Sequence, residues 1–290
     1  MPELPEVETV WRGLRSVMEG YVIERVEQRR DDLRFPLPPR FSSDLAGQSV
    51  IALTRRAKYL LAHLDNTNVL IMHLGMSGRF AVTHDGATQT PGRFHTQVPL
   101  AHEHIVFHMS GGARIGYSDP RRFGIMDLVS GDEITTHRLL CRLGPEPLGT
   151  TFSAAYLNQA LSQKHASIKS ALLDQRTVAG LGNIYVCEAL FRARIDPHRK
   201  AATLAGKRSP GQALTRLVTA VKAVLQQAIE AGGSSLRDHA ATDGTLGYFQ
   251  HSFAVYDREA SPCPRFDCPG SIARSVQSGR STYWCVRCQR

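Results

Sequence analysis

Four cysteines near the C-terminal end constrain this chain more than any other feature of its sequence. They form two pairs separated by sixteen residues, namely Cys263, Cys268, Cys285 and Cys288. Prolines and a glycine beside the first pair favour tight turns, and two such turns can bring four thiolates into a tetrahedral zinc site. Because thiolates take every position, we expect one structural Zn²⁺ with no open site for water. Disulfides are the alternative, but nothing in the sequence indicates an oxidising compartment.

The positive charge of the chain is concentrated in its last third. The 290 residues carry a formal net charge of +9, with an isoelectric point of about 9.5. Residues 191–290 hold 15 Lys and Arg against 7 Asp and Glu, which predicts a polyanionic partner. No apolar run approaches the length of a membrane span, and the first twenty residues do not resemble a signal peptide. We therefore expect a soluble, intracellular protein.

The pattern of apolar residues predicts an N-terminal helix followed by a β-rich region. Val7, Val10, Leu14 and Val17 recur with a helical period that ends at Gly20. Strands are then predicted over six segments: Val50–Leu53, Tyr59–Leu64, Val69–Leu74, Ile105–Met109, Arg114–Tyr117 and Gly124–Val129. We expect an antiparallel β-sandwich with the first helix packed against it.

The pattern of the rest of the chain predicts helices, with a hairpin at the end. Helices are predicted over four segments: Phe152–Ala160, Ser167–Leu173, Asn183–Arg192 and Pro210–Ala231. Val255–Arg290 reads as a cysteine-bearing β-hairpin. The expected fold class is α+β, with a β-sandwich domain at 1–132, a helical domain at 133–254 and a zinc finger at 255–290. Cys141 and Cys187 lie in apolar, helical-looking surroundings, so we expect buried thiols.

The first nine residues suggest a nucleophile. A small residue at position 2 allows Met1 to be trimmed, which leaves the secondary amine of Pro2 free beside Glu3, Glu6 and Glu8. Free α-amino groups titrate near about 7.7–8.0, so a neutral, nucleophilic fraction exists near neutral pH. Neighbouring carboxylates can transfer protons. The alternative is that proline and glutamate simply form the first turn of a helix, where both are favoured.

Two loops of the β-rich region combine apolar and cationic side chains. One carries Met76 between two glycines, and the other carries Arg121 and Phe123. An exposed Met and Phe beside an Arg could enter a base stack after a nucleotide is flipped out. The alternative is a pair of ordinary turns whose side chains fold inward.

Further polar clusters have both functional and structural interpretations. Asn183 follows a glycine-rich turn, where an N-cap, an amide donor and free N–H groups would suit a phosphate, although the turn could simply join two helices. Lys169, one helix earlier, either shares this role or is solvated. His102, His104 and His108 alternate along a strand. We expect them to form a polar face towards solvent or DNA rather than a metal site.

Eight motifs, in the same order along nearly the whole chain, resemble formamidopyrimidine-DNA glycosylase. They are Pro-Glu-Leu-Pro-Glu at the start, Arg-Ala-Lys58-Tyr-Leu, His-Leu-Gly-Met-Ser-Gly, Asp-Pro-Arg-Arg-Phe-Gly, Gly-Leu-Gly-Asn-Ile-Tyr, Asp243-Gly-x-x-Gly-Tyr-Phe-Gln250, Val-Tyr256 and the four-cysteine finger. The resemblance implies a cytoplasmic, nucleoid-associated monomer that excises oxidised purines, such as 8-oxoguanine and formamidopyrimidines, from double-stranded DNA. It also implies a helix–two-turns–helix domain and a loop over Ser235–Gly247 that closes on the lesion.

The same resemblance implies a role for each matching residue. Pro2 would attack C1′ and form a Schiff base, Glu3 would transfer protons, and β- and δ-elimination would follow. Lys58 and Arg280 would join them in catalysis. Contacts to the DNA are implied for seven positions: Glu6, His73, Met76, Arg121, Phe123, Asn183 and Tyr256. From its place one helix before Asn183, we also count Lys169 among the expected DNA-binding residues. Of these, His73, Asn183 and Tyr256, together with Lys58 and Arg280, would contact phosphates, and Arg121 would address the orphaned cytosine.

Two departures from the family pattern and two rival functions stay open at this point. The first cysteine pair encloses four residues where the family usually has two, and Ala57 replaces a common Gly. An untrimmed Met1 would block the amine. An endonuclease VIII-like enzyme for oxidised pyrimidines shares the terminal proline and the finger, but it usually carries Gly where this chain has Leu4. A zinc-ribbon protein that only binds damaged DNA would not need an amine beside a carboxylate.

Overall fold

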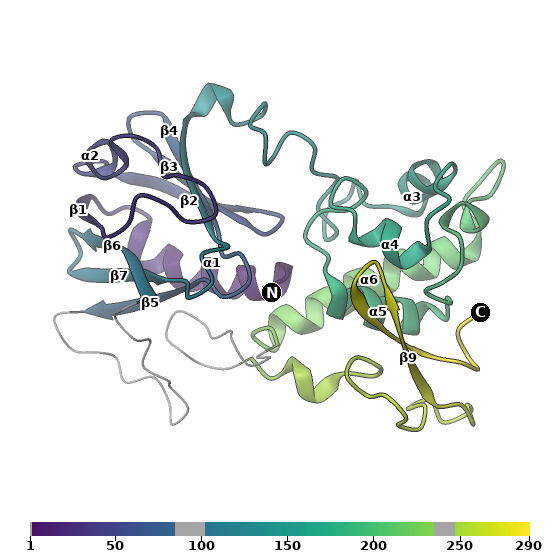
Figure 1. The fold of residues 1–290 in the computed structure, drawn as a ribbon. Helices are drawn as coiled ribbons and strands as arrows, with labels where there is room; N and C mark the ends of the chain where they lie inside the picture. Colours follow the sequence, from purple (N-terminus) through teal and green to yellow (C-terminus); the bar gives the residue numbers. More distant parts are fainter. Residues whose placement is uncertain (1, 85–101, 235–246) are drawn as a thin grey trace. The chain divides into compact units, whose positions relative to one another are not determined.

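The computed structural model describes residues 2–84, 102–234 and 247–290, which fall into two compact units (Figure 1). The sandwich unit comprises Met1–Cys141 and Ile229–Tyr248, and the helical unit comprises Arg142–Ala228 and Phe249–Arg290. Met1, most of the expected lesion-closing loop and the start of the Asp243 motif lie outside the described residues. The division into domains at 1–132, 133–254 and 255–290 stays a prediction, because the two units are defined by compactness alone.

The sandwich unit holds two antiparallel four-stranded sheets, as the sequence predicts. One sheet has the order β1-β6-β7-β5, formed by Ile23–Gln28, Glu103–Met109, Ala113–Ser118 and Arg79–His84. The other has the order β2-β3-β4-β8, formed by Val50–Arg56, Tyr59–Leu64, Asn68–His73 and Ile125–Ser130. The apolar pattern does not reveal β1 and β5, because both are edge strands rich in polar residues, which protect an edge from pairing with other chains.

Helix α1 (Leu4–Met18) packs on this sandwich. Its stripe of Leu4, Val7, Val10, Leu14 and Met18 is almost completely buried. The helical period predicts three of these residues, but Val17, the fourth predicted member, is only partly buried. The helix ends just before Gly20, whose φ of +86° lies in the left-handed region. The N-terminus of the chain is thereby fixed to the sandwich. The short helix α2 (Phe41–Leu45) lies in the same unit.

The helical unit contains α3 (Ala154–Leu161), α4 (Ile168–Leu173), α5 (Asn183–Ala193) and most of α6 (Gln212–Glu230). The hairpin β9 (Ile272–Gln277) and β10 (Arg280–Cys285) turns through Ser278 and Gly279, which both have positive φ. This is the two-residue turn that matches the twist of a hairpin. Cys187 and Phe191 of α5 share a buried cluster with Ile272, Tyr283 and Cys285, so the finger packs on α5. The predicted helices are confirmed within a few residues at each end, whereas the strands of the hairpin occupy only Ile272–Cys285 of the predicted segment Val255–Arg290.

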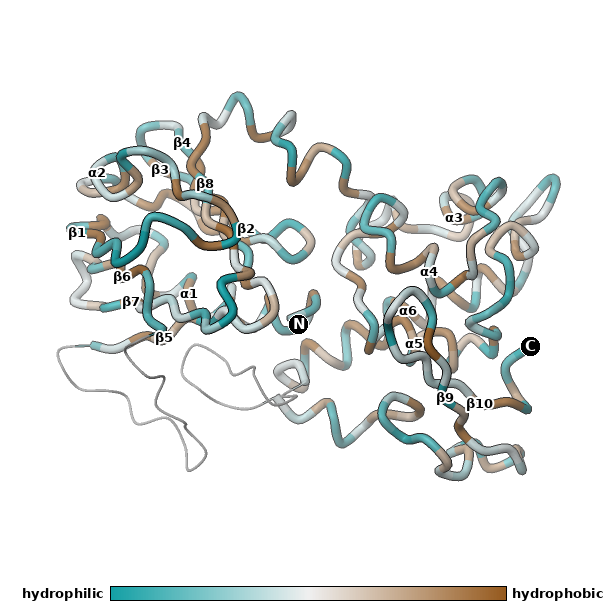
Figure 2. The backbone as a smooth tube through the Cα atoms, in the orientation of Figure 1, coloured by the Kyte–Doolittle hydropathy of each residue, from teal (hydrophilic) through white to brown (hydrophobic). Residues whose placement is uncertain are grey.

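None of the helices within residues 2–84, 102–234 and 247–290 has both the length and the apolar character needed to cross a membrane. Figure 2 shows why, since hydrophobic stretches along the backbone are short and broken by hydrophilic residues.

Two expectations about buried and exposed side chains are wrong. Cys141 is exposed, because it lies in a turn after η2 (Gly131–Glu133) rather than in a helix, whereas Cys187 is buried as expected. His104 does not belong to a polar face, because the pairing of β6 with β7 shifts register between Glu103 and Ile105. Its side chain is 5% exposed, and its Nε2 lies 2.9 Å from the backbone oxygen of Asp119. His108 contacts Glu27 instead, with Nε2 2.8 Å from a carboxylate oxygen.

Ala57 occupies the turn between β2 and β3 with a φ of +55°. A side chain in this left-handed region costs about 1–2 kcal/mol, which explains why glycine suits the position. We expect Ala57→Gly to raise the free energy of unfolding by roughly 0.5–1 kcal/mol after the entropy of glycine is subtracted, and the melting temperature by roughly 1–3 °C. Ala62→Gly, in the buried middle of β3, should lower the melting temperature. A lower melting temperature for Ala57→Gly would show that the turn is not strained.

Candidate active site and nucleic-acid interface

The N-terminal segment is buried and held by one carboxylate. Pro2 is buried and Glu3 is 3% exposed. Glu6, which is 2% exposed, accepts the backbone N–H of Glu3 at 2.8 Å through Oε2. Its Oε1 accepts the backbone N–H and the hydroxyl of Ser234, at 2.8 and 3.0 Å. We expected Glu6 to face a flipped nucleotide. That contact stays a prediction, and in the structure the two oxygens of Glu6 join the residue after Pro2 to Ser234.

A second buried contact joins α1 to the turn that carries Lys58. Arg55 donates from Nε to Glu8 Oε2 at 2.8 Å and from Nη1 to the backbone oxygen of Ala57 at 2.9 Å. The side chains of Arg55 and Glu8 are each 13% exposed, so the pair is well shielded from water. Glu8 therefore holds the turn, and Lys58 itself is 6% exposed. The position of Lys58 depends on the same helix that begins next to Pro2.

His73 is held in its neutral form next to Lys58. Burial, assisted by the charges of Lys58 and Arg34, lowers the pKa of His73 to about 4. The backbone N–H of Gly75 donates to His73 Nδ1 at 3.0 Å. Nδ1 is therefore the acceptor, and the neutral ring carries its proton on Nε2. His73 can offer one N–H donor to an anion at any physiological pH.

The side chains expected to enter a base stack are exposed. Met76 is 36% exposed and Phe123 is 40% exposed, so the alternative of inward-folded turns is wrong. The guanidinium carbon of Arg121 lies 4.8 Å from the centre of the Phe123 ring, a cation–π contact. The three residues present two apolar tips and one cation on two loops of the sandwich unit.

In the helical unit, Lys169 and Asn183 both hold the hairpin. Lys169 Nζ donates to the backbone oxygen of Ser281 at 2.9 Å and to Thr282 Oγ1 at 2.7 Å. Asn183 Nδ2 donates to the same Ser281 oxygen at 2.9 Å. Lys169 is 0% exposed, so the expectation of a solvated or DNA-contacting side chain is corrected to a positioning role. Asn183 is also not the N-cap of α5, because Gly182 takes that position.

Arg280 is the exposed residue at the start of β10, directly after the hairpin turn. It precedes Ser281, so the contacts of Lys169 and Asn183 fix the backbone beside it. Tyr256 is partly buried and lies against Tyr283, with ring centres 5.1 Å apart. Both predicted phosphate-contacting side chains of the finger region therefore have a fixed base.

Glu188 of α5 is a residue that the sequence analysis missed. It is 0% exposed, and its carboxylate accepts the backbone N–H groups of Ala254, Val255 and Tyr256 at 2.9–3.1 Å. Backbone N–H donors offset the cost of burying the carboxylate. Glu188 thus positions Tyr256. The sequence contains a sign of this role, namely a glutamate within the apolar run of α5. A carboxylate buried with such a helix needs hydrogen-bond partners.

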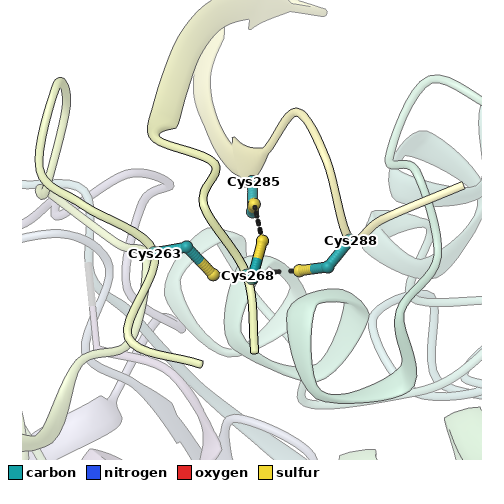
Figure 3. A group of neighbouring side chains, drawn as sticks. All are labelled: Cys263, Cys268, Cys285 and Cys288. Carbon is teal, nitrogen blue, oxygen red and sulfur yellow. Dashed lines mark hydrogen bonds between the residues drawn. The ribbon is translucent and has the colours of Figure 1, made fainter. Parts of the chain in front are cut away.

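The four cysteines are arranged for a tetrahedral metal. Their sulfur atoms all lie within 4.8 Å of one another and converge on one point (Figure 3). Two sulfur–sulfur distances are 3.5 and 3.9 Å, close to the roughly 3.8 Å that zinc–sulfur bonds of about 2.3 Å impose. Burial opposes ionisation of Cys285, but backbone hydrogen bonds from Cys288 and Arg287 lower its pKa to about 7. The donor set fits one structural Zn²⁺, and the wider first turn still closes.

Two family profiles match the chain. The profile of the formamidopyrimidine-DNA glycosylase N-terminal domain matches residues 1–126, and that of the formamidopyrimidine-DNA glycosylase H2TH domain matches residues 143–240. These ranges hold the buried N-terminal segment, the two exposed loops, Lys169 and Asn183.

Whole proteins similar to the chain agree with the profiles. Formamidopyrimidine-DNA glycosylases of Bradyrhizobium sp. strain BTAi1 and Rhodopseudomonas palustris strain TIE-1 are 59% and 56% identical over 293 residues, covering 100% of each chain. The crystal structure of MutM (Fpg) from Thermus thermophilus is 37% identical, with a TM-score of 0.82 over 98% of this chain and 97% of that one. Lactococcus lactis Fpg in complex with DNA containing an abasic site is 31% identical, with a TM-score of 0.83 and 100% coverage of both.

The neutral state of His73 makes stability depend on pH. The unfolded chain takes up a proton near the ordinary histidine pKa of 6.5, whereas the folded chain does so only near 4. The contribution of His73 is therefore complete above about pH 6.5 and is lost as the pH falls towards 4. Between about pH 7 and pH 5 the wild type should lose about 2 kcal/mol more unfolding free energy than His73→Gln. Equal losses in denaturant titrations of the two proteins would contradict the buried, neutral state.

The role of Lys169 can be tested without DNA. Lys169→Met removes the ammonium but keeps a side chain of similar length, so Ser281 and Thr282 lose a charged donor. We expect amide hydrogen exchange in β10 to accelerate about tenfold or more, with zinc content unchanged. Lys164→Met removes the same charge from a partly exposed ion pair with Asp174 and should leave β10 unaffected. The same exchange rates in wild type and Lys169→Met would exclude the positioning role.

Proposed function

This chain belongs to the formamidopyrimidine-DNA glycosylase family, and we propose that Pro2 is the nucleophile with which it excises oxidised purines from duplex DNA. The chain is a bifunctional DNA glycosylase and AP lyase. The observation that carries the assignment of Pro2 is the buried Pro2–Glu3 segment at the head of α1, held by Glu6. A free imino terminus fixed in this way can be aimed at one carbon atom, which is the main requirement for nucleophilic attack.

The proposed reaction starts at C1′ of the damaged nucleotide. The lone pair of the Pro2 nitrogen forms a bond to C1′, and the oxidised base leaves with the electrons of the glycosidic bond and takes up a proton. Glu3 takes the N–H proton from the Pro2 nitrogen and gives a proton to the ring oxygen, so the nitrogen lone pair opens the sugar ring and produces an iminium ion between Pro2 and C1′. A secondary amine forms this cation directly, because its nitrogen has no second proton to lose.

Strand cleavage follows from the iminium ion. It acidifies the C2′ proton, whose removal expels the 3′ phosphate by β-elimination. A second elimination expels the 5′ phosphate, and hydrolysis then frees Pro2. The product is a one-nucleotide gap with phosphate at both ends. In this scheme Glu3 transfers the protons, and Glu6 keeps the Glu3 backbone in place.

We propose further contacts to the phosphates of the damaged duplex. We assign these contacts to Lys58 and His73 in the sandwich unit and to Asn183, Tyr256 and Arg280 in the helical unit. Lys58 and Arg280 carry positive charge, and His73 contributes its neutral Nε2–H donor. Lys169 supports Arg280 from within the fold. Contacts of this kind make affinity fall steeply with salt, with a log–log slope of roughly −0.9 per phosphate on duplex DNA.

The space left by the extruded nucleotide is assigned to Met76, Arg121 and Phe123. Their exposure and the contact between Arg121 and Phe123 support this assignment. Arg121 would address the orphaned cytosine through its hydrogen-bond donors. Because the substrate is chromosomal DNA, the enzyme would act in the cytoplasm at the nucleoid.

The covalent intermediate provides the test. Borohydride reduces an iminium ion to a stable amine, so wild-type protein should be trapped on a duplex containing 8-oxoguanine opposite cytosine. Pro2→Gly leaves only a primary amine at the terminus and should give much less trapped complex, and a protein that retains Met1 should give none. Pro5→Ala is the matched control, because it removes a proline from the same segment without touching the terminus, and it should still be trapped.

Two outcomes would contradict the proposal. Trapping with a thymine glycol duplex but not with 8-oxoguanine would indicate an enzyme for oxidised pyrimidines. Tight binding of the 8-oxoguanine duplex without any trapping would indicate a protein that only binds damaged DNA.

A further inference from the structure

Beneath the exposed tips of the sandwich unit, one buried carboxylate joins two loops. We call these the Met76 loop (residues 74–78) and the Phe123 loop (residues 119–124). Asp119 is 0% exposed, and its Oδ1 accepts the hydroxyl of Ser77 at 2.6 Å. Its Oδ2 accepts the backbone N–H of Gly124 at 2.7 Å. One side chain therefore bonds to the Met76 loop and closes the Phe123 loop at the same time.

Two further contacts connect the loops, namely a second hydrogen bond of Ser77 and direct packing of the two backbones. Ser77 Oγ, besides donating to Asp119, accepts the backbone N–H of Arg121 at 3.3 Å. Gly75 has a φ of +63°, and a Cβ atom there would lie 2.3 Å from the carbonyl carbon of Phe123. The two backbones therefore touch, and only glycine permits this approach. The loops cannot move independently without breaking these contacts.

The sheet fixes Asp119 from below. His104 of β6 bonds through Nε2 to the backbone oxygen of Asp119 at 2.9 Å, and the Tyr117 hydroxyl of β7 donates to Oδ2 at 3.3 Å. Both side chains are nearly inaccessible, at 5% and 1% exposure. Burial, with the nearby Asp119 charge, raises the pKa of Tyr117, so its hydroxyl keeps its proton. The pair of loops therefore stands on a rigid base.

We propose that Asp119 is a positioning residue for base extrusion, which makes the Met76 loop and the Phe123 loop enter the duplex as one rigid body. This inference rests on the proposed function. Filling the gap left by a flipped nucleotide requires Met76, Arg121 and Phe123 to arrive together. Two loops that are already ordered relative to each other do not lose conformational entropy when they bind. Loosening their connection should therefore impair extrusion and leave chemistry at the sugar intact.

The test compares a substrate that needs extrusion with one that does not. The first is a duplex with 8-oxoguanine opposite cytosine. The second is a single-stranded oligonucleotide with an abasic site, in which there is no base to extrude and no gap in a duplex to fill. Ser77→Ala removes the hydroxyl that bonds to Asp119 and Arg121. Asp119→Asn replaces one of the two accepting oxygens of the carboxylate with an NH₂ group, which cannot accept a hydrogen bond. We expect single-turnover excision from the duplex to fall about tenfold in each, because a hydrogen bond to a charged group is lost. Cleavage of the single strand should change less than about twofold.

Glu103→Gln is the matched control. Glu103 is a buried carboxylate at 8% exposure that bonds to Arg114 at 3.0 Å and pairs with Arg29, and these contacts involve neither loop. This variant should keep the wild-type ratio between the two substrates. If Ser77→Ala loses activity equally on both substrates, or loses none on the duplex, the inference is overturned. Wild-type activity on both substrates tests the proposed function separately from the variants.

Discussion

Buried carboxylates that accept backbone N–H groups hold the functional segments of this protein in place. Glu6 binds the N–H groups of Glu3 and Ser234, Asp119 binds that of Gly124, and Glu188 binds those of residues 254–256. Removing a carboxylate from water is costly, and it is tolerated only where its oxygens are fully hydrogen-bonded. Each acceptor therefore allows few backbone arrangements. The predicted nucleophile, the loops that enter the duplex and a phosphate contact each depend on one such anchor.

Much of the architecture could be predicted from local patterns. The period of Val7, Val10 and Leu14 indicates α1, and short apolar runs between turn residues indicate six of the eight sandwich strands, because buried segments leave a clear signature in the sequence. The edge strands β1 and β5 leave none, since they bury little and are polar. The cysteine spacing indicates the metal site because zinc geometry admits few ligand patterns. Exposure of Met76 and Phe123 follows from their place between turn residues.

Contacts between distant segments could not be predicted in the same way. The sequence around Lys169 gives no sign that its side chain is buried. Only the fold shows that it reaches Ser281 and Thr282 in the hairpin, more than a hundred residues away. Glu6 and Glu188 likewise bind backbone groups far along the chain. The side chain of His104 points inward because of a shift in strand register, and no residue in the sequence indicates that shift. Local sequence reports propensity and burial, but the partner of a buried polar group depends on the tertiary fold.

The proposed function depends on a covalent bond between the imino nitrogen of Pro2 and the damaged sugar. The most direct measurement is peptide mapping by mass spectrometry of the complex reduced with borohydride on 8-oxoguanine DNA, after digestion with nuclease and protease. We expect the sugar-derived mass on the peptide that begins at Pro2, on its terminal nitrogen. A sugar-derived mass on a lysine, such as Lys58, with an unmodified Pro2 peptide would contradict it.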